Sequence, residues 1–533
     1  HFYIVLNCFL FSLYLSVRAL REPERRLPLT LAALVFSFVN LLTMEYFYFL
    51  EFARLILFWL VLQDEPKQKI RRALLLFVPY FAVMLGVTFW RLFFFENQNA
   101  SYSYVTLKLL REAPLLGIAS LFKSIMMAFW ETVLKAWAFP FASATIEQIG
   151  PRVVLLSAAL VLVSTLSIAI YFLFFNQHEQ TERRWIKEMF LLGFGMWLLA
   201  GGSFWMVDIE PQLHFSMDRF TLPFMLGASL LAVALIGLSG LSRPKLQYAL
   251  LALLIAFSIG KQFEVNIAYV RDWDVQHDLF WQMSWRIPAL EKNTALVSND
   301  LPVTYFSDNS LSGPLNWIYS PPGEMNHILY FISIRLNSGL PELKPDLPFE
   351  QNYLAKYFYG NTSQLVVIDF SPPACLRALD PQIHGENPFI APLLRDAAAL
   401  SNTAMIQAGD SAELPKSLFA PEPAHGWCYY FEKADLARQL GDWEEVVKLG
   451  DIAFKLDDHP NNPIERFVFI EGYARAGDWE RALKLSRESY KVSKGFVGPP
   501  LCRLWERIET ETTPSAERSA ALAEVESMLA CKP

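Results

Sequence analysis

The chain has 533 residues, of which 53% are hydrophobic, 15% aromatic and 19% charged, with a formal net charge of −7. This composition is too apolar for an ordinary soluble protein and too charged for a purely membrane-embedded one. We therefore expect a domain embedded in a lipid bilayer and joined to a large soluble part. The negative net charge gives no reason to expect a nucleic-acid partner, so none is expected.

Apolar segments separated by short charged loops fill the first half of the chain. Eight of them are long enough, or nearly so, to cross a hydrocarbon core of about 30 Å. The expected spans cover residues 2–17, 27–43, 46–63, 73–93, 151–175, 189–207, 220–240 and 246–262. The pattern predicts an integral, multi-pass protein of the cell or plasma membrane, with a transmembrane domain at 1–262.

Lysine and arginine gather in every second loop, and the positive-inside rule makes these loops cytoplasmic. The basic loops contain Arg18, Arg21, Arg25 and Arg26; Lys67, Lys69, Arg71 and Arg72; Arg183, Arg184 and Lys187; and Arg243 and Lys245. The other connections, and everything after residue 262, are then expected outside the membrane. The first span runs inward, so at least one further span is expected upstream of His1.

Residues 94–150 are expected to form a long outer loop. Within it, Leu116 to Phe139 is apolar but is interrupted by Lys123, Glu131 and Lys135. Charges spaced along an apolar stretch favour an amphipathic helix in the membrane interface over a ninth span.

The soluble tail divides into two parts. Residues 263–425 alternate strand-like runs (294–298, 364–370) with helical stretches (278–290, 326–336) and Pro-rich turns, which predicts a small α/β domain with a mostly parallel sheet. Residues 426–533 are helical and repetitive. The expected fold is mainly α: a polytopic helical membrane domain, an extracytoplasmic α/β domain and a C-terminal α-helical hairpin repeat.

The repeat is the clearest pattern of the soluble part. Gly441-Asp442-Trp443 recurs 36 residues later as Gly477-Asp478-Trp479. Each glycine ends one helix and each aspartate caps the next, while the tryptophans are expected to be largely buried between the paired helices. Residues 501–508 and 516–529 predict a third pair. Such repeats form either a concave surface that binds a protein partner or a helical cap on the α/β domain, and about three units are needed for a stable solenoid.

The five cysteines show no metal-ligand spacing. Cys8 lies in a span, whereas Cys375, Cys428, Cys502 and Cys531 lie in the tail. An outside location permits disulfides, and Cys375 with Cys428 or Cys502 with Cys531 are the natural pairings. Three connectivities remain open, and free buried thiols fit the sequence equally well.

Ionisable residues at the outer ends of the expected spans are the candidate functional groups, because charges at that depth are costly and usually face a protein interior or an aqueous cavity. The alternative for each residue is that its side chain extends to the interface. The candidates are Glu45, Glu51, Arg91, Asp208, Glu210, Asp218 and Arg219, while His214 is expected to be a simple loop residue.

Two segments resemble the GT-C class of membrane glycosyltransferases, which contains the protein mannosyltransferases. Leu41-Leu42-Thr43-Met44-Glu45 is similar to the acid-bearing outer end of a helix in that class. Residues 216–223 resemble the acid-Arg-aromatic-x-Leu-Pro segment that opens a late span in members with C-terminal tetratricopeptide repeats. The order of elements, with spans followed by a soluble domain and repeats, also matches.

The resemblance implies transfer of a sugar from a polyprenyl-phosphate donor, a lipid-linked sugar, to an acceptor at the outer face. Glu45, Asp208 or Asp218 would act as the catalytic carboxylate that takes the acceptor proton or holds a divalent metal. Arg91 and Arg219 would bind the phosphate, for which guanidinium groups are well suited.

One difference between this sequence and the GT-C family leaves two alternative functions open. GT-C enzymes carry an acidic catalytic residue in a first outer loop, and no such loop precedes His1 in the sequence. Either the segment expected upstream carries this loop, or the protein is an inactive relative. The alternative function is a non-catalytic membrane-anchored protein whose external α/β and repeat domains bind a protein partner.

Overall fold

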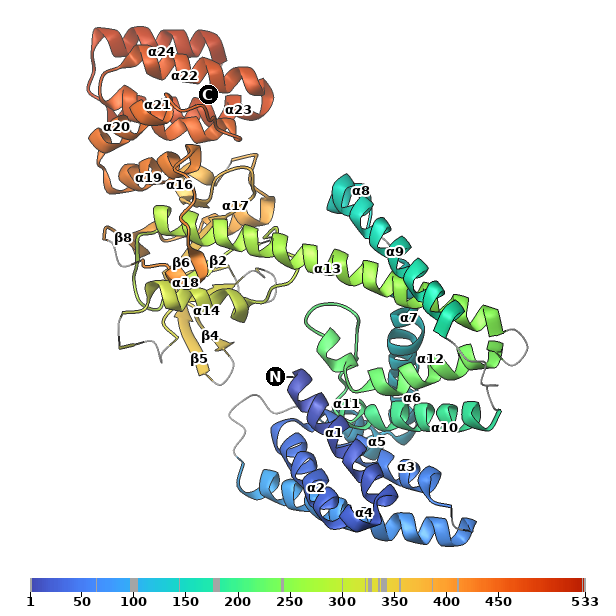
Figure 1. Cartoon of the computed structure of the whole chain (residues 1–533). Helices are drawn as coiled ribbons and strands as arrows, with labels where there is room; N and C mark the ends of the chain where they lie inside the picture. The colour runs from blue at the N-terminus through green and yellow to red at the C-terminus, as the bar shows by residue number, and fades with distance from the viewer. Residues whose placement is uncertain are drawn as a thin grey trace. The chain divides into compact units, whose positions relative to one another are not determined.

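The computed structural model describes residues 2–63, 65–95, 104–142, 144–175, 183–240, 244–299, 301–321, 323–324, 328–333, 336, 343–353, 356–385, 387–409, 412–529 and 531. The chain divides into two compact units, His1–Ala268 and Tyr269–Pro533 (Figure 1). Helices dominate both units and small sheets occur in the second, so the mainly α fold class is confirmed.

Unit 1 consists of helices joined by short turns. The longer helices are α1 (Phe2–Arg21), α2 (Arg26–Thr43), α3 (Ala53–Val61), α4 (Pro66–Phe93), α5 (Val105–Glu112), α6 (Pro114–Phe129), α9 (Pro151–Phe175), α10 (Arg183–Ala200), α12 (Phe224–Gly240) and α13 (Pro244–Arg286). The core of this unit is rich in aromatic rings, and Trp197 packs at its centre against Phe129, Trp205 and Phe224.

Six helices in the described part of the chain are long and apolar enough to cross a membrane. They cover Phe2–Arg21, Pro23–Thr43, Pro66–Phe93, Pro114–Phe141, Pro151–Phe172 and Lys245–Arg286, and Phe224–Ser239 is a shorter apolar helix. These helices support the prediction of a multi-pass membrane protein. The side of the membrane on which each loop lies stays a prediction.

The expected span at 46–63 is not one continuous helix. Two 3₁₀ turns, η2 (Glu45–Phe47) and η3 (Phe49–Phe52), precede α3, which has only nine residues and a length of about 14 Å. Glu51 and Arg54 occupy this break and are fully buried. The apolar character of the segment therefore arises from packing inside the protein, because a buried short helix has the same composition as a spanning one.

The expected outer loop at 94–150 is largely helical where it is described. α6 continues through a π-helical turn, η4 (Trp130–Lys135), and Ala128 and Val133 belong to the core of unit 1. Pro114–Phe141 is also one of the six candidate spans, so an interfacial position is not required. Two of the three charges that suggested the interface neutralise each other, because Lys135 Nζ lies 2.7 Å from Glu131 Oε1.

A four-stranded sheet lies at the centre of the first part of unit 2. Its strand order is β3 (Phe331–Ser333), β2 (Ala295–Val297), β6 (Leu365–Asp369) and β7 (Arg377–Ala378). β2 runs parallel to both β3 and β6, and β7 is antiparallel to β6. The strands at 295–297 and 365–369 lie where the sequence predicts them. Around the sheet lie α14 (Asp308–Tyr319), α16 (Pro381–His384), α17 (Pro392–Ala398), α18 (Lys416–Phe419) and the strand pairs β4 (Pro348–Tyr353) with β5 (Lys356–Asn361) and β1 (Ala289–Leu290) with β8 (Ile406–Gln407).

Two helices predicted in this region differ from the structure. Residues 331–333 of the expected helix 326–336 form β3, and residues 326–327 and 334–335 lie outside the described part. β3 is buried throughout, and a short, continuous apolar run does not distinguish a strand from a helix by periodicity. The helix expected at 278–290 ends at Arg286 as part of α13, and Ala289 and Leu290 pair as β1.

Three helical hairpins form the C-terminal part of unit 2 among its described residues (Figure 1). They are α19 (Trp427–Leu440) with α20 (Trp443–Ala453), α21 (Phe467–Arg475) with α22 (Trp479–Val492), and α23 (Lys494–Glu511) with α24 (Ala516–Leu529). Gly441 and Gly477 follow α19 and α21 with φ of 77° and 81°, a backbone conformation that favours glycine. Asp442 and Asp478 cap the next helices.

Trp443 and Trp479 pack against the core of the hairpins but are only partly buried. This partial burial is compatible with the expectation that both rings pack between the paired helices. The guanidinium carbon of Arg475 lies 4.0 Å from the centre of the Trp443 ring, so a cation covers one face of that ring.

One disulfide and a buried ion pair attach the first hairpin to the α/β part of unit 2. Cys375 is bonded to Cys428 at the start of α19, and Cys502 is bonded to Cys531, so both natural pairings are present. Arg286 donates a hydrogen bond of 2.7 Å to Asp435 on α19, and both side chains are buried. These contacts make the sheet and the first hairpin one packed body.

Candidate functional site

Arg91 and Glu45 meet at the ends of two apolar helices of unit 1. Arg91, in the last turn of α4, donates a hydrogen bond of 2.8 Å from Nη1 to Glu45 Oε2. Its Nη2 donates to the carbonyl oxygens of Leu41 and Leu42 at distances of 3.1 and 3.3 Å. The last carbonyls of a helix lack partners within that helix and carry its negative dipole end, so Arg91 caps α2 and holds Glu45 at the same time.

The turn that carries Glu45 is fixed from a second side. Ser203 donates a hydrogen bond of 2.9 Å to the Glu45 carbonyl oxygen. The adjacent Tyr46 ring packs against Phe204 and Phe220 with centroid distances of 5.2 and 5.5 Å. Phe220 belongs to η6 (Asp218–Thr221), so ring packing brings the turn of Glu45 beside the turn of two further candidates.

Asp218 and Arg219 are exposed on that neighbouring turn. The Asp218 carboxylate accepts a hydrogen bond from the Arg219 backbone N–H at 2.9 Å, which stabilises the turn. The Arg219 guanidinium lies 4.8 Å from the centre of the Phe220 ring, and within the described chain it forms no ion pair. A cation held on an aromatic face without a carboxylate partner remains available to an anionic ligand.

Asp208 and His214 lie in the loop before η6. Asp208 is exposed and has a φ of 56°, which is uncommon outside glycine and asparagine. The His214 ring nitrogens lie 2.9 Å from the Phe215 carbonyl oxygen and 2.5 Å from Gln212 Oε1, both within the same loop. The assignment of His214 as a loop residue agrees with these contacts.

The structure thus brings together some of the predicted residues directly and others through packing. Glu45 and Arg91 form one ion pair, and Asp218 and Arg219 lie on the adjoining turn. No described contact joins the two pairs, and Asp208 contacts neither. Among the described residues no three metal-ligating side chains gather into one site. The functional roles of the five residues stay predictions.

Glu131 supports the same region, a role that the sequence did not reveal. It accepts hydrogen bonds of 2.7 and 2.9 Å from Lys135 and one of 3.1 Å from the backbone N–H of Leu213. Glu131 and Lys135 both lie in the π-helical turn η4, and such turns frequently occur at functional sites. The sequence feature that could have indicated this role is an acidic residue in the middle of an apolar stretch.

A second group that the sequence did not single out is Arg54. Its guanidinium donates to Glu51, to Ser16 and to Ser12, and its carbon lies 4.2 Å from the centre of the Tyr80 ring. All of these side chains are buried. Because every partner comes from the protein interior, this network fixes helices rather than contacting a ligand.

Comparisons of the chain with protein-family models, with curated proteins and with solved structures find no match. The functional argument therefore rests on the residues and their geometry.

Proposed function

We propose that this protein is a membrane glycosyltransferase that transfers a sugar from a polyprenyl-phosphate donor to an acceptor at one membrane face. The observation that carries the proposal is the placement of carboxylates and guanidiniums on two adjoining turns at the ends of apolar helices. A lipid-linked donor presents its phosphate at such a depth, and its chemistry requires both kinds of group.

The contacts assign different tasks to the two arginines. Arg91 is occupied by Glu45 and by two helix carbonyls, so it organises the site and contributes positive potential. Arg219 has no ion-pair partner among the described residues and is the stronger candidate for the donor phosphate. The exposed Asp218 and Asp208 carboxylates are candidates for the acceptor proton or for a divalent metal, while Glu45 is paired.

The two disulfides support an extracytoplasmic position of unit 2, because such bonds persist in oxidising compartments. The active face would then be the outer one, as the basic loops predict.

Sugar transfer by the full chain in vesicles tests the proposal. The vesicles contain a polyprenyl-phosphate sugar with a labelled sugar group, and the label transferred to added acceptor peptides, glycans or lipids is measured. We expect R219Q and D218N each to lower transfer at least about 100-fold, because a phosphate-binding cation and a general base each contribute that much. E188Q, which removes an acid paired with Arg184 in another region, should leave transfer unchanged. Equal transfer by R219Q, D218N and wild type would refute the assignment.

The second candidate function is partner binding by the three hairpins of unit 2. The partly buried Trp443 and Trp479 favour it, because large rings at a helical surface are common in protein interfaces. A W479A variant that folds like wild type and transfers sugar normally, but no longer binds a purified partner, would support this function.

A further inference from the structure

A cleft of about 520 Å³ lies inside unit 2, where α16 and α17 face the beginning of α21 and the middle of α23. Its volume is in the range of about 300 to 1,000 Å³ that is usual for small-molecule sites. Its lining combines apolar residues, of which Ile383 and Pro500 are partly exposed, with the polar or charged side chains of Gln382, Asn387, Arg395, Asp396, Arg503 and Arg507. The cleft therefore has the mixed character of a site that holds both a charged group and an apolar body.

Arg395 on α17 supplies a positive charge that has no ion-pair partner among the described residues. Its side chain forms no ion pair or hydrogen bond with any described residue, and its Nε is buried without a partner. A guanidinium stays protonated at every pH that a protein tolerates. A half-buried charge without a counter-charge is costly, and an anion in the cleft would remove that cost.

Asn387 supplies a buried hydrogen-bond donor. Its side chain is 2% exposed, and its Oδ1 accepts from the Phe389 backbone N–H at 3.0 Å. Its Nδ2 has no partner within the described part of the chain. Since buried polar groups are nearly always hydrogen-bonded, the amide that lines this cleft indicates an acceptor on a ligand.

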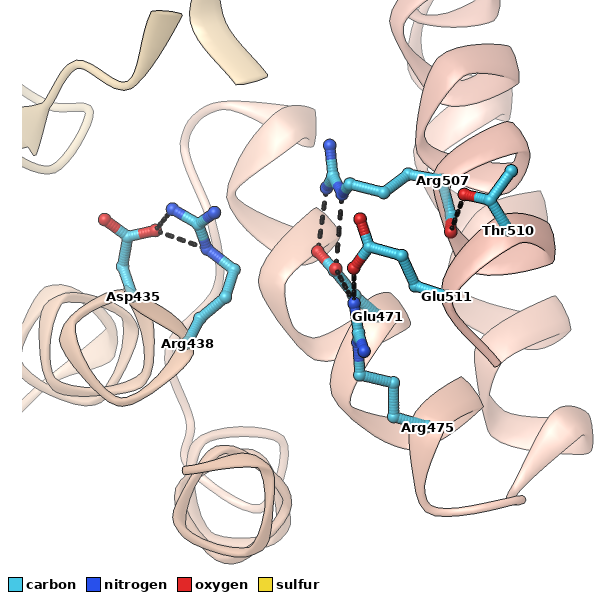
Figure 2. A network of polar contacts seen from close by, with 7 residues as sticks. All are labelled: Asp435, Arg438, Glu471, Arg475, Arg507, Thr510 and Glu511. Carbon is cyan, nitrogen blue, oxygen red and sulfur yellow. Dashed lines mark hydrogen bonds and ion pairs between the residues drawn. The ribbon is translucent and has the colours of Figure 1, made fainter. Parts of the chain in front are cut away.

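Arg507 on α23 supplies a cation of fixed orientation. Its Nε and Nη2 donate to the two carboxylate oxygens of Glu471 at 3.2 and 2.7 Å, and Figure 2 shows the third nitrogen pointing away from that carboxylate. Burial raises the pKa of Glu471, but the hydrogen bond with Arg507 and the positive charges of Arg507, Arg438 and Arg475 together outweigh burial and lower the pKa. Glu471 thus stays ionised and holds Arg507 in place.

We propose that this cleft binds a small oxyanion, a phosphate monoester or a carboxylate, attached to a compact apolar body. Arg395 and Arg507 would contact the oxyanion together with the Asn387 amide, and Arg503 adds a further positive charge one turn before Arg507. Asp396 is the sole acid among the described lining residues, so the lining carries three positive charges and one negative charge. The apolar body would lie on Ile383 and Pro500, the partly exposed apolar residues of the lining. This site is separate from the proposed sugar-transfer site.

Calorimetric titration of the purified full chain in a neutral detergent, without phosphate buffer, tests the inference. The probes are phenyl phosphate, phenylacetate and, as the uncharged comparison, benzyl alcohol. We expect one or both anions to bind with a single site while benzyl alcohol does not. The stronger of the two anions identifies the phosphate or the carboxylate as the preferred group. R395Q should weaken that binding at least tenfold.

R487Q is the matched control, because Arg487 is an exposed arginine of α22 that pairs with Glu524 outside the cleft. It should bind the anion as wild type does. Hydrogen exchange of residues 387–409 shows whether R395Q is folded, and R503Q, at an exposed position, provides a second variant with the same expected loss. Absence of binding by wild type, binding by R395Q and R503Q equal to wild type, or an equal loss in R487Q would overturn the inference.

Discussion

Arg54 donates a hydrogen bond of 2.7 Å from its Nε to Glu51 Oε2, and neither side chain is exposed. The pair lies in the break between η3 and α3 and is completed by Ser12 and Ser16 of α1. When one member of a buried ion pair is removed, no water takes its place and the other charge is left without a partner. The stability of each buried charge therefore depends on the other.

Removing one member of this pair should destabilise unit 1 strongly. We expect R54M and E51Q each to lower the free energy of unfolding by about 3 to 5 kcal/mol, as is usual when one buried charge loses its partner. The double variant should cost much less than the sum, because it leaves no isolated charge. Thermal unfolding in detergent measures these effects. R71Q, which removes an exposed arginine, is the control and should unfold at the same temperature as wild type. An R54M variant that unfolds at the wild-type temperature would contradict the prediction.

The two repeat tryptophans should now contribute unequally to stability. A fully buried tryptophan costs about 3 to 5 kcal/mol when replaced by alanine, and these partly buried rings should cost about 2 to 3 kcal/mol. W443A should cost about 0.5 to 1 kcal/mol more than W479A, because it also loses the contact with Arg475. Hydrogen exchange in residues 427–492 is the measurement. Equal protection in wild type and both variants would show that neither ring stabilises the hairpins.

The sequence predicted elements best where one local pattern fixes the structure. Gly441 and Gly477 end their helices and Asp442 and Asp478 begin the next ones, because a positive φ and an N-cap depend on single residues. The burial of Trp443 was not predictable in the same way, since it depends on Arg475, which lies 32 residues later in the chain.

In the candidate site, too, single residues could be identified from the sequence, whereas their contacts could not. Glu45 and Arg91 were both identifiable as charges at the ends of apolar segments, but their ion pair joins residues 46 positions apart. The buried role of Arg54 was not predicted, because an arginine inside an expected span cannot be interpreted until its partner is known. Its local signal was Glu51, three residues earlier, a spacing that places both on one helical face.

The topology predicted from the basic loops can be tested by labelling in intact cells. We expect a cysteine introduced at Arg71 to be protected from a membrane-impermeant maleimide and one introduced at Glu444 to be labelled, since residues 262–533 are expected outside. Both positions are exposed on their own units. Permeabilised cells, in which both cysteines should react, provide the control. Labelling at position 71 without labelling at position 444 would show that the chain has the opposite orientation in the membrane.

His384 should make unit 2 sensitive to acid. Burial lowers its pKa from 6.5 to about 3; Asp435 opposes the shift, and Arg438, Arg377 and Arg286 add to it. Below pH 6.5 the unfolded chain binds a proton that the folded chain does not, so this residue's contribution is full above pH 6.5 and is lost as pH falls toward 3.

The comparison of wild type with H384N isolates that contribution. Between pH 7 and 5, the difference in unfolding free energy should change by up to about 1.4 kcal/mol per pH unit below pH 6.5, with wild type losing stability faster on acidification. Asparagine keeps an oxygen that can accept from the Asp380 backbone N–H, as His384 Nδ1 does at 2.9 Å. Denaturant unfolding followed by exchange of residues 377–385 provides the measurement. Parallel pH profiles would contradict the prediction.

Glu432 should have the opposite dependence on pH. Burial raises its pKa well above 4.5, although the Leu376 backbone N–H and Arg286 favour the charged form. Its Oε1 accepts the Leu376 N–H at 3.2 Å, while Oε2 has no partner among the described residues. The folded state therefore holds a proton that the unfolded state releases. Its stabilising contribution is full below pH 4.5 and is lost as pH rises through the raised pKa.

Replacing Glu432 with glutamine should remove that loss, because the amide keeps the acceptor oxygen and carries no charge. We expect E432Q to be at least as stable as wild type at pH 8 and to show a weaker decline in stability between pH 5 and pH 8. E471Q is the matched comparison, since Glu471 has a lowered pKa and accepts from Arg507 and Arg475. It should lose stability at pH 8, by about 1 to 3 kcal/mol for hydrogen bonds to a charged group. Hydrogen exchange in α19 and α21 at both pH values distinguishes the two variants. If E432Q is destabilised at pH 8 as much as E471Q, Glu432 is charged in the folded protein and the prediction is contradicted.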